Sequence, residues 1–419
     1  MYETITLPNG VRILTEQVPG VRSACLGIWV GSGSRHERPE ENGAAHFLEH
    51  MVFKGTQRRT AAELAQEMDA IGGQVNAGTT KECTCFYARA LDTHLPQATD
   101  LLCDMFFHAK FREEDVQTER GVILEEIGMY EDHPEDLCAE RLSAAVFAGS
   151  SLARPILGTR ESLEPMTGAW LQDYQRTHYL AGDLVVALAG RFTPADVDTL
   201  KSAFAPLAGG ALPPPAPAAY IPAFTVKEKP IEQTHLTLAF PGLPYGSPKR
   251  FTLQLLSTIL GGGVSSRLWQ RVREDQGLCY SIYSYGAGYA ETGLFGIYTA
   301  LSQETESQAL STICGAVQDF TVHGVTSQEL DRAREQSKAN VLMGLESTQS
   351  HMSNLGRGAL LQGEVLDPDQ IIAAYDAVTC EDVRTLAEEL FDFRRISLSA
   401  VGQVGTEASY RELLQQCMA

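Results

Sequence analysis

The sequence predicts an α+β protein made of two similar domains, each with a mostly antiparallel sheet that helices cover on one face. Three observations lead to this prediction: the length of 419 residues, a proline-rich stretch near the middle, and strand-like and helix-like runs in a similar order on both sides of it. A chain of this length is too long for one ordinary hydrophobic core, so two or three domains are expected.

The boundary between the domains is expected in the segment 209–222, which begins with the sequence Gly-Gly-Ala-Leu-Pro-Pro-Pro-Ala-Pro. Proline fixes its φ angle and lacks an amide hydrogen, so this stretch is an extended spacer that belongs to neither a helix nor a central strand. We therefore expect a metal-binding domain at 1–208 and a second domain, without metal, at 223–419. Halves of nearly equal size suggest an internal duplication.

The first elements follow one another in a similar order in the two halves. In the first half, strand-like runs at 11–15 and 23–30 precede a helix at about 41–54. In the second half, an alternating run at 235–240 precedes a helix at about 248–260. Because strand runs are interleaved with helical runs and often alternate in polarity, the pattern favours a sheet with helices packed on one side.

Both halves then continue with helices and end in an apolar strand. Helical stretches are expected at about 94–108, 112–130, 305–323 and 327–346. The apolar runs that close the two halves are at 184–189 and 396–401.

Charge and hydropathy argue against several classes of partner. The formal net charge is −20, with 33 basic and 53 acidic residues, so nucleic acid and anionic membranes would be repelled. No stretch approaches the roughly 18 consecutive apolar residues of a membrane span, and the first residues lack the profile of a secretory signal or a transit peptide. We therefore expect a cytoplasmic protein without nucleic-acid or membrane partners. The acidity either attracts basic peptides or only keeps the protein soluble.

Nine cysteines are scattered along the chain, and no Cys-x-x-Cys pair occurs. An odd count without that spacing indicates neither a disulfide framework nor a thiolate zinc site. We expect these cysteines to be small buried residues of a protein in a reducing compartment.

The strongest chemical signal is the pentapeptide His46-Phe47-Leu48-Glu49-His50 in an apolar stretch. On a helix, side chains at i and i+4 stand on one face about 5–6 Å apart, so His46 and His50 can bind one metal ion at about 2.0–2.1 Å each. Glu49 lies off that face but can reach a water molecule held beside the metal and take its proton. The alternative, three polar side chains buried without a metal, is costly because each of them needs a partner.

A catalytic zinc usually has three protein ligands, and a later helical stretch offers the third. At about 100° per residue, one helical face carries Glu119, Val122, Ile123 and Glu126 together. Glu125 points elsewhere, toward the polar side. A glutamate on an inward apolar face needs a partner, so Glu126 is the predicted ligand. Glu119 either orients a ligand histidine through a hydrogen bond or is a surface charge.

Four segments of the chain resemble motifs of one known family. They are the pentapeptide with the following residues 51–56, the segment 76–87, the helical segment 119–126 and the segment 273–280. At these positions the family has its inverted zinc motif, paired strands beside the active site, the helix with the last metal ligand, and an Arg…Tyr pair. The family is that of pitrilysin, insulysin and the mitochondrial processing peptidase. The resemblance covers essentially the whole chain and is strongest to a short bacterial member.

The resemblance implies roles for residues outside the pentapeptide. It selects Glu126 as the third metal ligand, in agreement with the helical-wheel argument, and it places Asn76 and Ala77 beside the substrate. Arg273 and Tyr280 are implied to hold the substrate backbone or carbonyl, and both side chains can donate hydrogen bonds to a developing oxyanion. The alternative for these two residues is a core tyrosine with an exposed arginine.

The function that the resemblance implies is that of a zinc-dependent endopeptidase with one Zn²⁺ per chain, acting on unfolded peptides or small proteins in a chamber of two halves. Manganese or cobalt can occupy similar ligands. A narrower alternative is a protease that removes leader peptides. A non-catalytic scaffold subunit is an alternative of another class, which the complete motif disfavours. Short family members work as pairs of chains, so we expect a homodimer or a heterodimer with a related chain.

Overall fold

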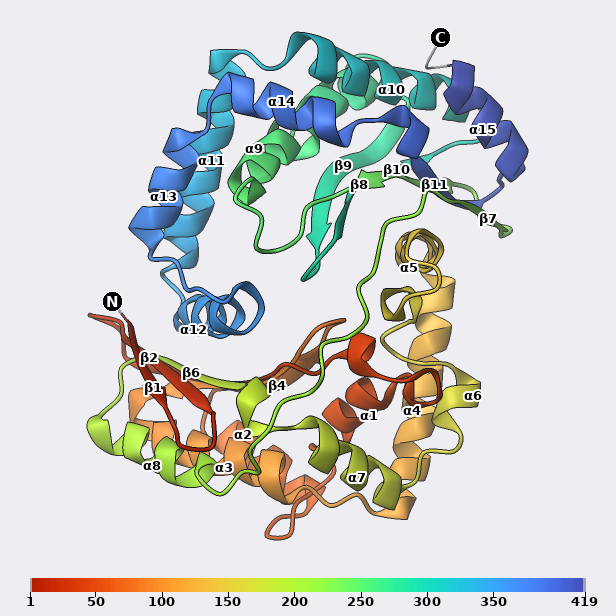
Figure 1. Cartoon of the computed structure of the whole chain (residues 1–419). Helices are drawn as coiled ribbons and strands as arrows, with labels where there is room; N and C mark the ends of the chain where they lie inside the picture. Colours follow the sequence, from red (N-terminus) through yellow and green to blue (C-terminus); the bar gives the residue numbers. More distant parts are fainter. Residues whose placement is uncertain (1, 417–419) are drawn as a thin grey trace. The chain divides into compact units, whose positions relative to one another are not determined.

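The structure is a computed structural model that describes residues 2–416, and it contains two sheets that belong to two compact units (Figure 1). Unit 1 is formed by the chain up to Ile127, by Arg154–Ala216 and by Met343–Asp367. Unit 2 is formed by Gly128–Ala153, by Pro217–Leu342 and by the chain from Pro368 onward. Each unit has its own hydrophobic core.

The sheet of unit 1 has six strands in the order β1-β2-β6-β3-β5-β4. These strands are β1 (Tyr2–Thr6), β2 (Arg12–Gln17), β3 (Ser23–Val30), β4 (Gln74–Thr79), β5 (Thr84–Leu91) and β6 (Leu184–Gly190). Neighbouring strands are antiparallel except for β2 and β6, which run parallel. The central strands β3 and β6 are buried along almost their whole length, as is typical of strands that are covered on both faces.

The sheet of unit 2 has five strands in the order β7-β11-β8-β10-β9. These strands are β7 (Phe224–Glu228), β8 (Thr234–Pro241), β9 (Cys279–Gly288), β10 (Gly293–Leu301) and β11 (Ser397–Gly402). Apart from the additional β1 of the first sheet, the strands of both sheets are connected in the same order. In both, the strand that comes first along the chain (β2 or β7) pairs in parallel with the strand that comes last (β6 or β11). This repetition confirms the prediction of two similar, mostly antiparallel α+β domains.

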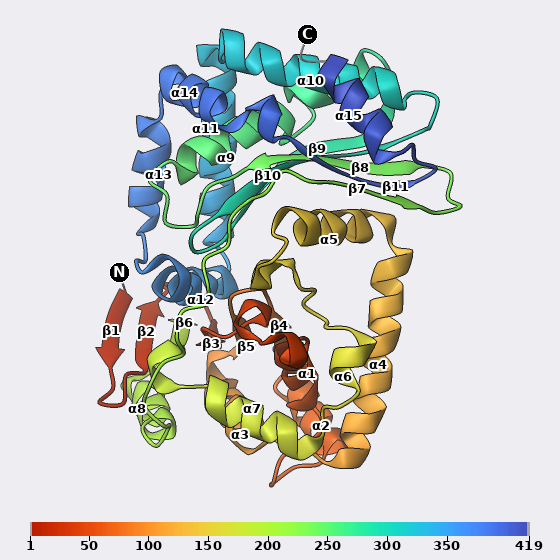
Figure 2. The same ribbon diagram turned by 45° about the vertical axis from the view of Figure 1, so that its right-hand side comes forward.

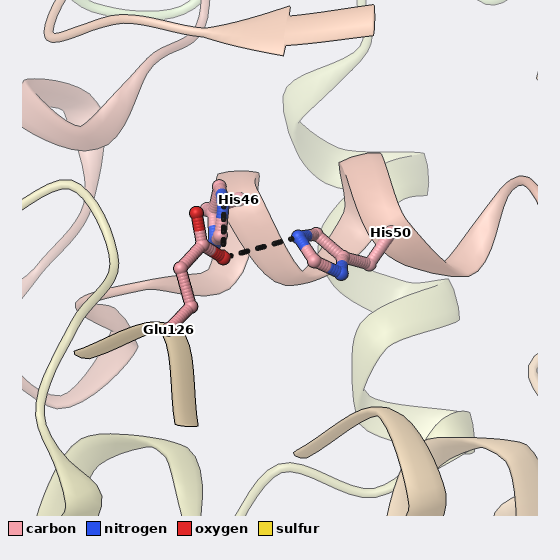
Figure 3. Close-up of side chains that lie close together, drawn as sticks. All are labelled: His46, His50 and Glu126. Atoms are coloured by element: carbon pink, nitrogen blue, oxygen red, sulfur yellow. Dashed lines mark ion pairs between the residues drawn. The ribbon is translucent and has the colours of Figure 1, made fainter. Parts of the chain in front are cut away.

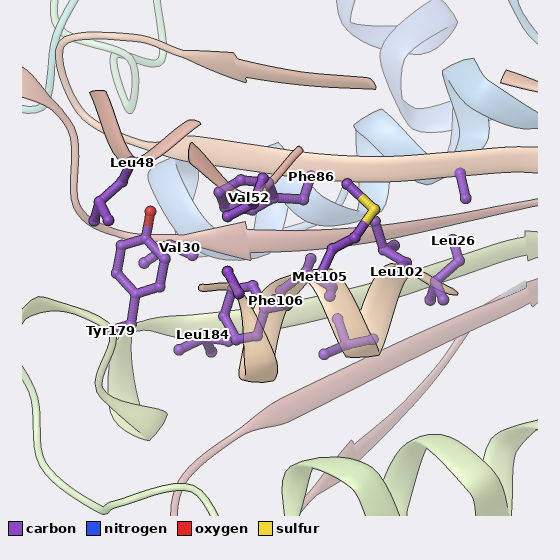
Figure 4. Close-up of a cluster of buried hydrophobic side chains, with 14 of the residues drawn as sticks. Leu26, Val30, Leu48, Val52, Phe86, Leu102, Met105, Phe106, Tyr179 and Leu184 are labelled. Atoms are coloured by element: carbon purple, nitrogen blue, oxygen red, sulfur yellow. The ribbon is translucent and has the colours of Figure 1, made fainter. Parts of the chain in front are cut away.

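Helices cover one face of the first sheet and form the main core of unit 1. Figure 4 shows part of this core, where Leu26 and Phe86 from the sheet lie close to Leu102 and Phe106 of a long helix. Besides α12, which is described below, the α-helices of this unit are α1 (Ala44–Met51), α2 (Ala61–Ala70), α3 (Leu95–His108), α6 (Arg160–Leu163), α7 (Gly168–His178), α8 (Pro194–Phe204) and most of α4 (Glu113–Asp132). The pentapeptide lies in α1, and its Leu48 belongs to the same core.

The second core is built in the same way, with helices over one face of its sheet (Figure 2). Phe240 and Phe295 of the sheet and Phe320 of a helix gather around Phe391, with ring centroids 5.2 to 6.4 Å apart. The helices of this unit include α9 (Arg250–Gly261), α10 (Glu306–His323), most of α11 (Ser327–Gly344), α13 (Pro368–Ala377), α14 (Cys380–Leu390) and α15 (Glu407–Gln416). None of the helices between residues 2 and 416 combines the length and the apolar composition that a bilayer-spanning helix needs.

Each sheet has a further helix on its opposite face, and that helix comes from the other half of the chain. α12 (Thr348–Arg357) packs on β3 and β6 of the first sheet, where the indole N–H of Trp29 donates a hydrogen bond to Sδ of Met352 at 3.2 Å. α5 (Pro134–Val146) packs on β8 and β11 of the second sheet (Figure 2). Cys138 lies at this contact. The two halves therefore exchange equivalent helices.

The domain boundaries expected from the sequence, 1–208 and 223–419, place α5 with the first sheet and α12 with the second. The contacts group each helix with the other sheet. The sequence of an amphipathic helix shows that it covers an apolar surface, but not which of two similar sheets provides that surface. Residues 209–222, all of them described, form neither helix nor strand, as we expect of a proline-rich spacer.

Gly356 in α12 tests this packing, because a side chain at this position would overlap the indole ring of Trp29. We expect Gly356→Ala to lower the free energy of unfolding by about 1–3 kcal/mol, since overpacking a buried contact forces side chains out of place. Urea denaturation followed by tryptophan fluorescence measures this loss.

Gly121→Ala in α4 is the matched control, because its added Cβ meets no atom within 4 Å. A helix gains from alanine in place of glycine, so the free energy of unfolding of this variant should stay equal or rise by up to about 1 kcal/mol. Equal stability of Gly356→Ala and the wild type would contradict the packing of α12 on Trp29.

Candidate active site

The helix that carries the pentapeptide is held at its N-terminus by a buried carboxylate. The two oxygens of Glu37 accept hydrogen bonds from the backbone N–H groups of Gly43 and Ala45, both at 2.9 Å. The side chain of Asn42 donates a third hydrogen bond at 3.0 Å. Burial raises the pKa of Glu37 to about 7, against the effect of these hydrogen bonds. Glu37 was not among the residues predicted from the sequence, because it lies well before α1 and outside the spacing of a capping box.

Three side chains converge on one point beside α1. His46 and His50 are one helical turn apart, with ring centroids 4.6 Å from each other. Glu126 reaches toward both imidazoles from α4, and its Oε2 lies 3.6 Å from the Nε2 atom of each (Figure 3). One ligand atom from each of the three residues lies within 4.8 Å of the other two. Within residues 2–416, no other group of histidine, cysteine and acidic side chains converges in this way.

The spacing of these atoms fits a bound metal ion. Two tetrahedral ligand atoms at about 2.0–2.1 Å from an ion are about 3.4 Å apart, close to the observed separations from Glu126. Burial, and after it the charge of His50, lowers the pKa of His46 to about 4. A neutral imidazole is the form that binds a metal, so the residues present fit a zinc site of two histidines and one carboxylate.

Glu119 contacts His50 at Nδ1, the ring nitrogen that does not face Glu126. It is only 4% exposed, and its Oε1 is 2.8 Å from Nδ1 of His50. An ionised carboxylate only accepts hydrogen bonds, so Nδ1 carries the proton and Nε2 keeps its lone pair for a metal. The other oxygen of Glu119 forms an ion pair with Lys54. Of the two positions that the sequence left open for Glu119, the structure excludes the surface position.

Glu49 lies on α1 between the two histidine positions, but outside the group of converging ligand atoms. Burial raises the pKa of Glu49, whereas hydrogen bonds from Thr79, at the end of β4, lower it. Its Oε2 is buried and accepts no hydrogen bond from the described residues. One oxygen of this basic carboxylate is therefore not engaged by the protein, as a proton acceptor requires.

The buried face of α4 differs from the predicted one at one residue. Val122 was expected on the inward face, but it is 46% exposed, and the buried residues of this helix are Val116, Glu119 and Ile123. The buried stripe is centred between Glu119 and Ile123, so at about 100° per residue Val122 lies about 80° away from its centre, whereas Glu126 lies about 40° away, at its edge. The position at the edge leaves the Glu126 carboxylate half-buried and within reach of the histidines.

Asn76 and Ala77 lie in β4, the edge strand of the first sheet, which α1 contacts. Asn76 pairs with Tyr87 and Ala77 with Phe86 in the neighbouring β5. The side-chain oxygen of Asn76 accepts a hydrogen bond from the backbone N–H of Ala77 at 2.8 Å. The structure thus places these two residues on a strand next to the helix with the histidines.

Arg273 and Tyr280 belong to unit 2, whereas the histidines and Glu126 belong to unit 1. The guanidinium of Arg273 lies 5.4 Å from the ring centroid of Tyr280. Tyr280 is 77% exposed, so it is not a core tyrosine, which had been the alternative for this residue. Its phenol is therefore available for a ligand.

Two family models match the chain: residues 12–160 match insulinase (peptidase family M16), and residues 165–337 match the peptidase M16 inactive domain. The uncharacterized zinc protease YmxG of Bacillus subtilis is 43% identical over 393 residues, which are 93% of this chain and 96% of that protein. The chain belongs to the insulinase family. A further relative from this family, an uncharacterized zinc protease of Streptomyces coelicolor, is 41% identical over 418 residues, with 97% of this chain and 90% of that protein covered.

Solved structures share the fold of this insulinase-family chain. A peptidase M16 inactive domain from Pseudomonas fluorescens superimposes with a TM-score of 0.89 at 21% identity, over 97% of this chain and 99% of the other. A protease from Helicobacter pylori has a TM-score of 0.89 at 19% identity, over 96% and 99%. A chain of complex III2 from Candida albicans has a TM-score of 0.84 at 19% identity, over 98% and 99%. At these identities the likeness concerns the fold.

The contact between Glu119 and His50 leads to a prediction about metal affinity. We expect Glu119→Gln to weaken zinc binding by about 10- to 100-fold, because a neutral amide fixes the proton on Nδ1 less firmly than a carboxylate does. Competition with a chromophoric zinc chelator measures the dissociation constant. Glu125→Gln on the exposed side of the same helix should bind zinc like the wild type. Unchanged affinity of Glu119→Gln would show that this hydrogen bond does not support a metal site.

Proposed function

We propose that this protein is a zinc-dependent endopeptidase that hydrolyses peptide bonds in unfolded peptides or small proteins and binds one Zn²⁺ per chain. The observation that carries the proposal is the convergence of His46, His50 and Glu126 on one point, beside the basic carboxylate of Glu49. Membership of a peptidase family supports it, and so do relatives that are named zinc proteases.

Glu49 is the proposed general base. When bound, zinc supplies a Lewis acid that polarises the peptide carbonyl. Glu49 takes a proton from the attacking water molecule while the water oxygen forms a bond to the carbonyl carbon. It then gives this proton to the amine nitrogen as the C–N bond breaks. Burial suits this role, because it raises the pKa of the carboxylate and so makes it a better proton acceptor near neutral pH.

The free edge of β4 is the proposed binding place of the peptide. Among the strands of residues 2–416, this strand pairs only with β5, so its other edge can accept an extended peptide as an additional strand. Binding through backbone hydrogen bonds tolerates varied side chains, which suits unfolded substrates. Asn76 and Ala77 lie in this strand. Arg273 and Tyr280 are proposed, from the family resemblance, to donate hydrogen bonds to the substrate backbone or carbonyl.

Glu49→Gln separates hydrolysis from metal binding. We expect the rate of hydrolysis of an unfolded peptide to fall at least about 10²-fold, because an amide cannot accept the proton, while one zinc per chain remains bound. Mass spectrometry of the cleavage products measures the rate, and elemental analysis of the purified protein measures the zinc. Glu125→Gln is the matched control, with an exposed carboxylate on another helix, and its rate should be unchanged.

Other outcomes of the same measurements decide against the proposal. Hydrolysis by Glu49→Gln at the wild-type rate would rule out Glu49 as the base. A wild-type protein without bound zinc and without hydrolysis would favour the non-catalytic scaffold. Cleavage of leader peptides alone, with other unfolded peptides left intact, would favour the leader-peptide protease.

A further inference from the structure

A short π-helix, η6 (Trp269–Glu274), precedes β9 in unit 2. Its wide turn is visible in the backbone, where the N–H of Asp275 donates to the carbonyl of Gln270 at 2.8 Å, five positions earlier. π-helical turns are rare and occur frequently at functional sites. This turn carries Arg273, and the family resemblance singled out that residue without indicating what holds its side chain.

The side chain of Trp269 packs against Arg273. The guanidinium carbon lies 3.9 Å from the centroid of the indole ring, closer than the 5.4 Å to the ring of Tyr280. Both distances are within the roughly 6 Å over which a cation is attracted by an aromatic face, and tryptophan gives the strongest attraction. The indole N–H in turn donates to Oε1 of Glu274 at 3.0 Å, which fixes the orientation of the ring.

The hydrogen-bonding edges of the Arg273 guanidinium are not occupied by the described residues. Its nearest carboxylate oxygen is Oε1 of Glu274 at 3.9 Å, too far for a hydrogen bond. The neighbouring arginines differ, because Arg267 is bound by Glu329 at 2.7 and 2.9 Å and Arg271 by Asp319 at 2.5 Å. Stacking on an aromatic ring occupies the face of a guanidinium and leaves its N–H groups for an acceptor in the plane.

We propose that Trp269 is a positioning residue that holds the guanidinium of Arg273 ready to bind an oxygen acceptor of the peptide substrate, a backbone carbonyl or a carboxylate. The proposal rests on the proposed peptidase function and adds a residue that the sequence did not single out. An arginine on its own has many rotamers, and ordering them opposes binding. The indole removes most of these rotamers before the peptide arrives.

A double-mutant cycle tests this role in the full-length, zinc-loaded protein. The variants are Trp269→Ala, Arg273→Ala and the double variant, each also carrying Glu49→Gln so that peptide binding is measured without turnover. Fluorescence anisotropy of a labelled unfolded peptide reports the dissociation constant. We expect Trp269→Ala to weaken binding about tenfold, which corresponds to a cation–π contact of moderate strength, and to have no further effect in the Arg273→Ala background.

Two controls separate positioning from loss of structure. Trp269→Phe keeps an aromatic face and should restore most of the affinity. Trp170→Ala removes another half-buried indole, one that stacks on Tyr174 at 5.6 Å, and should bind the peptide like the wild type. With Glu49 present, Trp269→Ala should raise KM and leave kcat close to that of the wild type.

The proposal is overturned if Trp269→Ala binds like the wild type, if its effect adds fully to that of Arg273→Ala, or if Trp269→Phe is as weak as Trp269→Ala. These results are distinguishable from a failure of the proposed function. A wild-type protein that binds the peptide but does not cleave it would remove the peptidase proposal, whereas the binding cycle would still decide on Trp269. A protein that binds no peptide would overturn both.

Discussion

The candidate metal site depends on the approach of one carboxylate to two imidazoles that belong to a different helix. His46 and His50 share a face of α1, but the site exists only because α4 brings Oε2 of Glu126 to 3.6 Å from both Nε2 atoms. Small shifts of either helix would break this arrangement. Glu37 accepts hydrogen bonds from the backbone at the N-terminus of α1. The buried ion pair of Arg35 with Glu82 connects the segment before α1 to the turn between β4 and β5.

The exchange of helices gives α4 a second role in the fold. The boundary between the compact units lies after Ile127, directly behind Glu126, and the chain then continues through α5, which covers the sheet of unit 2. In the other half, α11 leads in the same way to α12, which covers the sheet of unit 1. The helix with the last candidate metal ligand is thus also one of the covalent connections from the first unit to the second.

The duplicated units differ in their chemistry although their topology is the same. α9 follows β8 as α1 follows β3, but it has Phe251 and Leu255 among its apolar residues and no histidine. This agrees with the match of residues 165–337 to a domain described as inactive. Unit 2 instead presents the exposed Tyr280 and a stacked arginine. Since folding depends on the pattern of apolar residues, one copy can lose a metal motif and keep its fold.

The sequence by itself determined the repeated α+β architecture and the pair of histidines, because strand alternation and the i, i+4 spacing are local patterns. It also singled out Glu126 rather than Glu125, although it misjudged Val122. Only the tertiary structure decided which sheet α5 and α12 cover, that Glu119 is buried against His50, that Glu37 binds the N-terminus of α1, and that Trp269 packs against Arg273. These facts depend on contacts between elements far apart in the chain or on an irregular turn. The local spacing of residues in the sequence predicts neither.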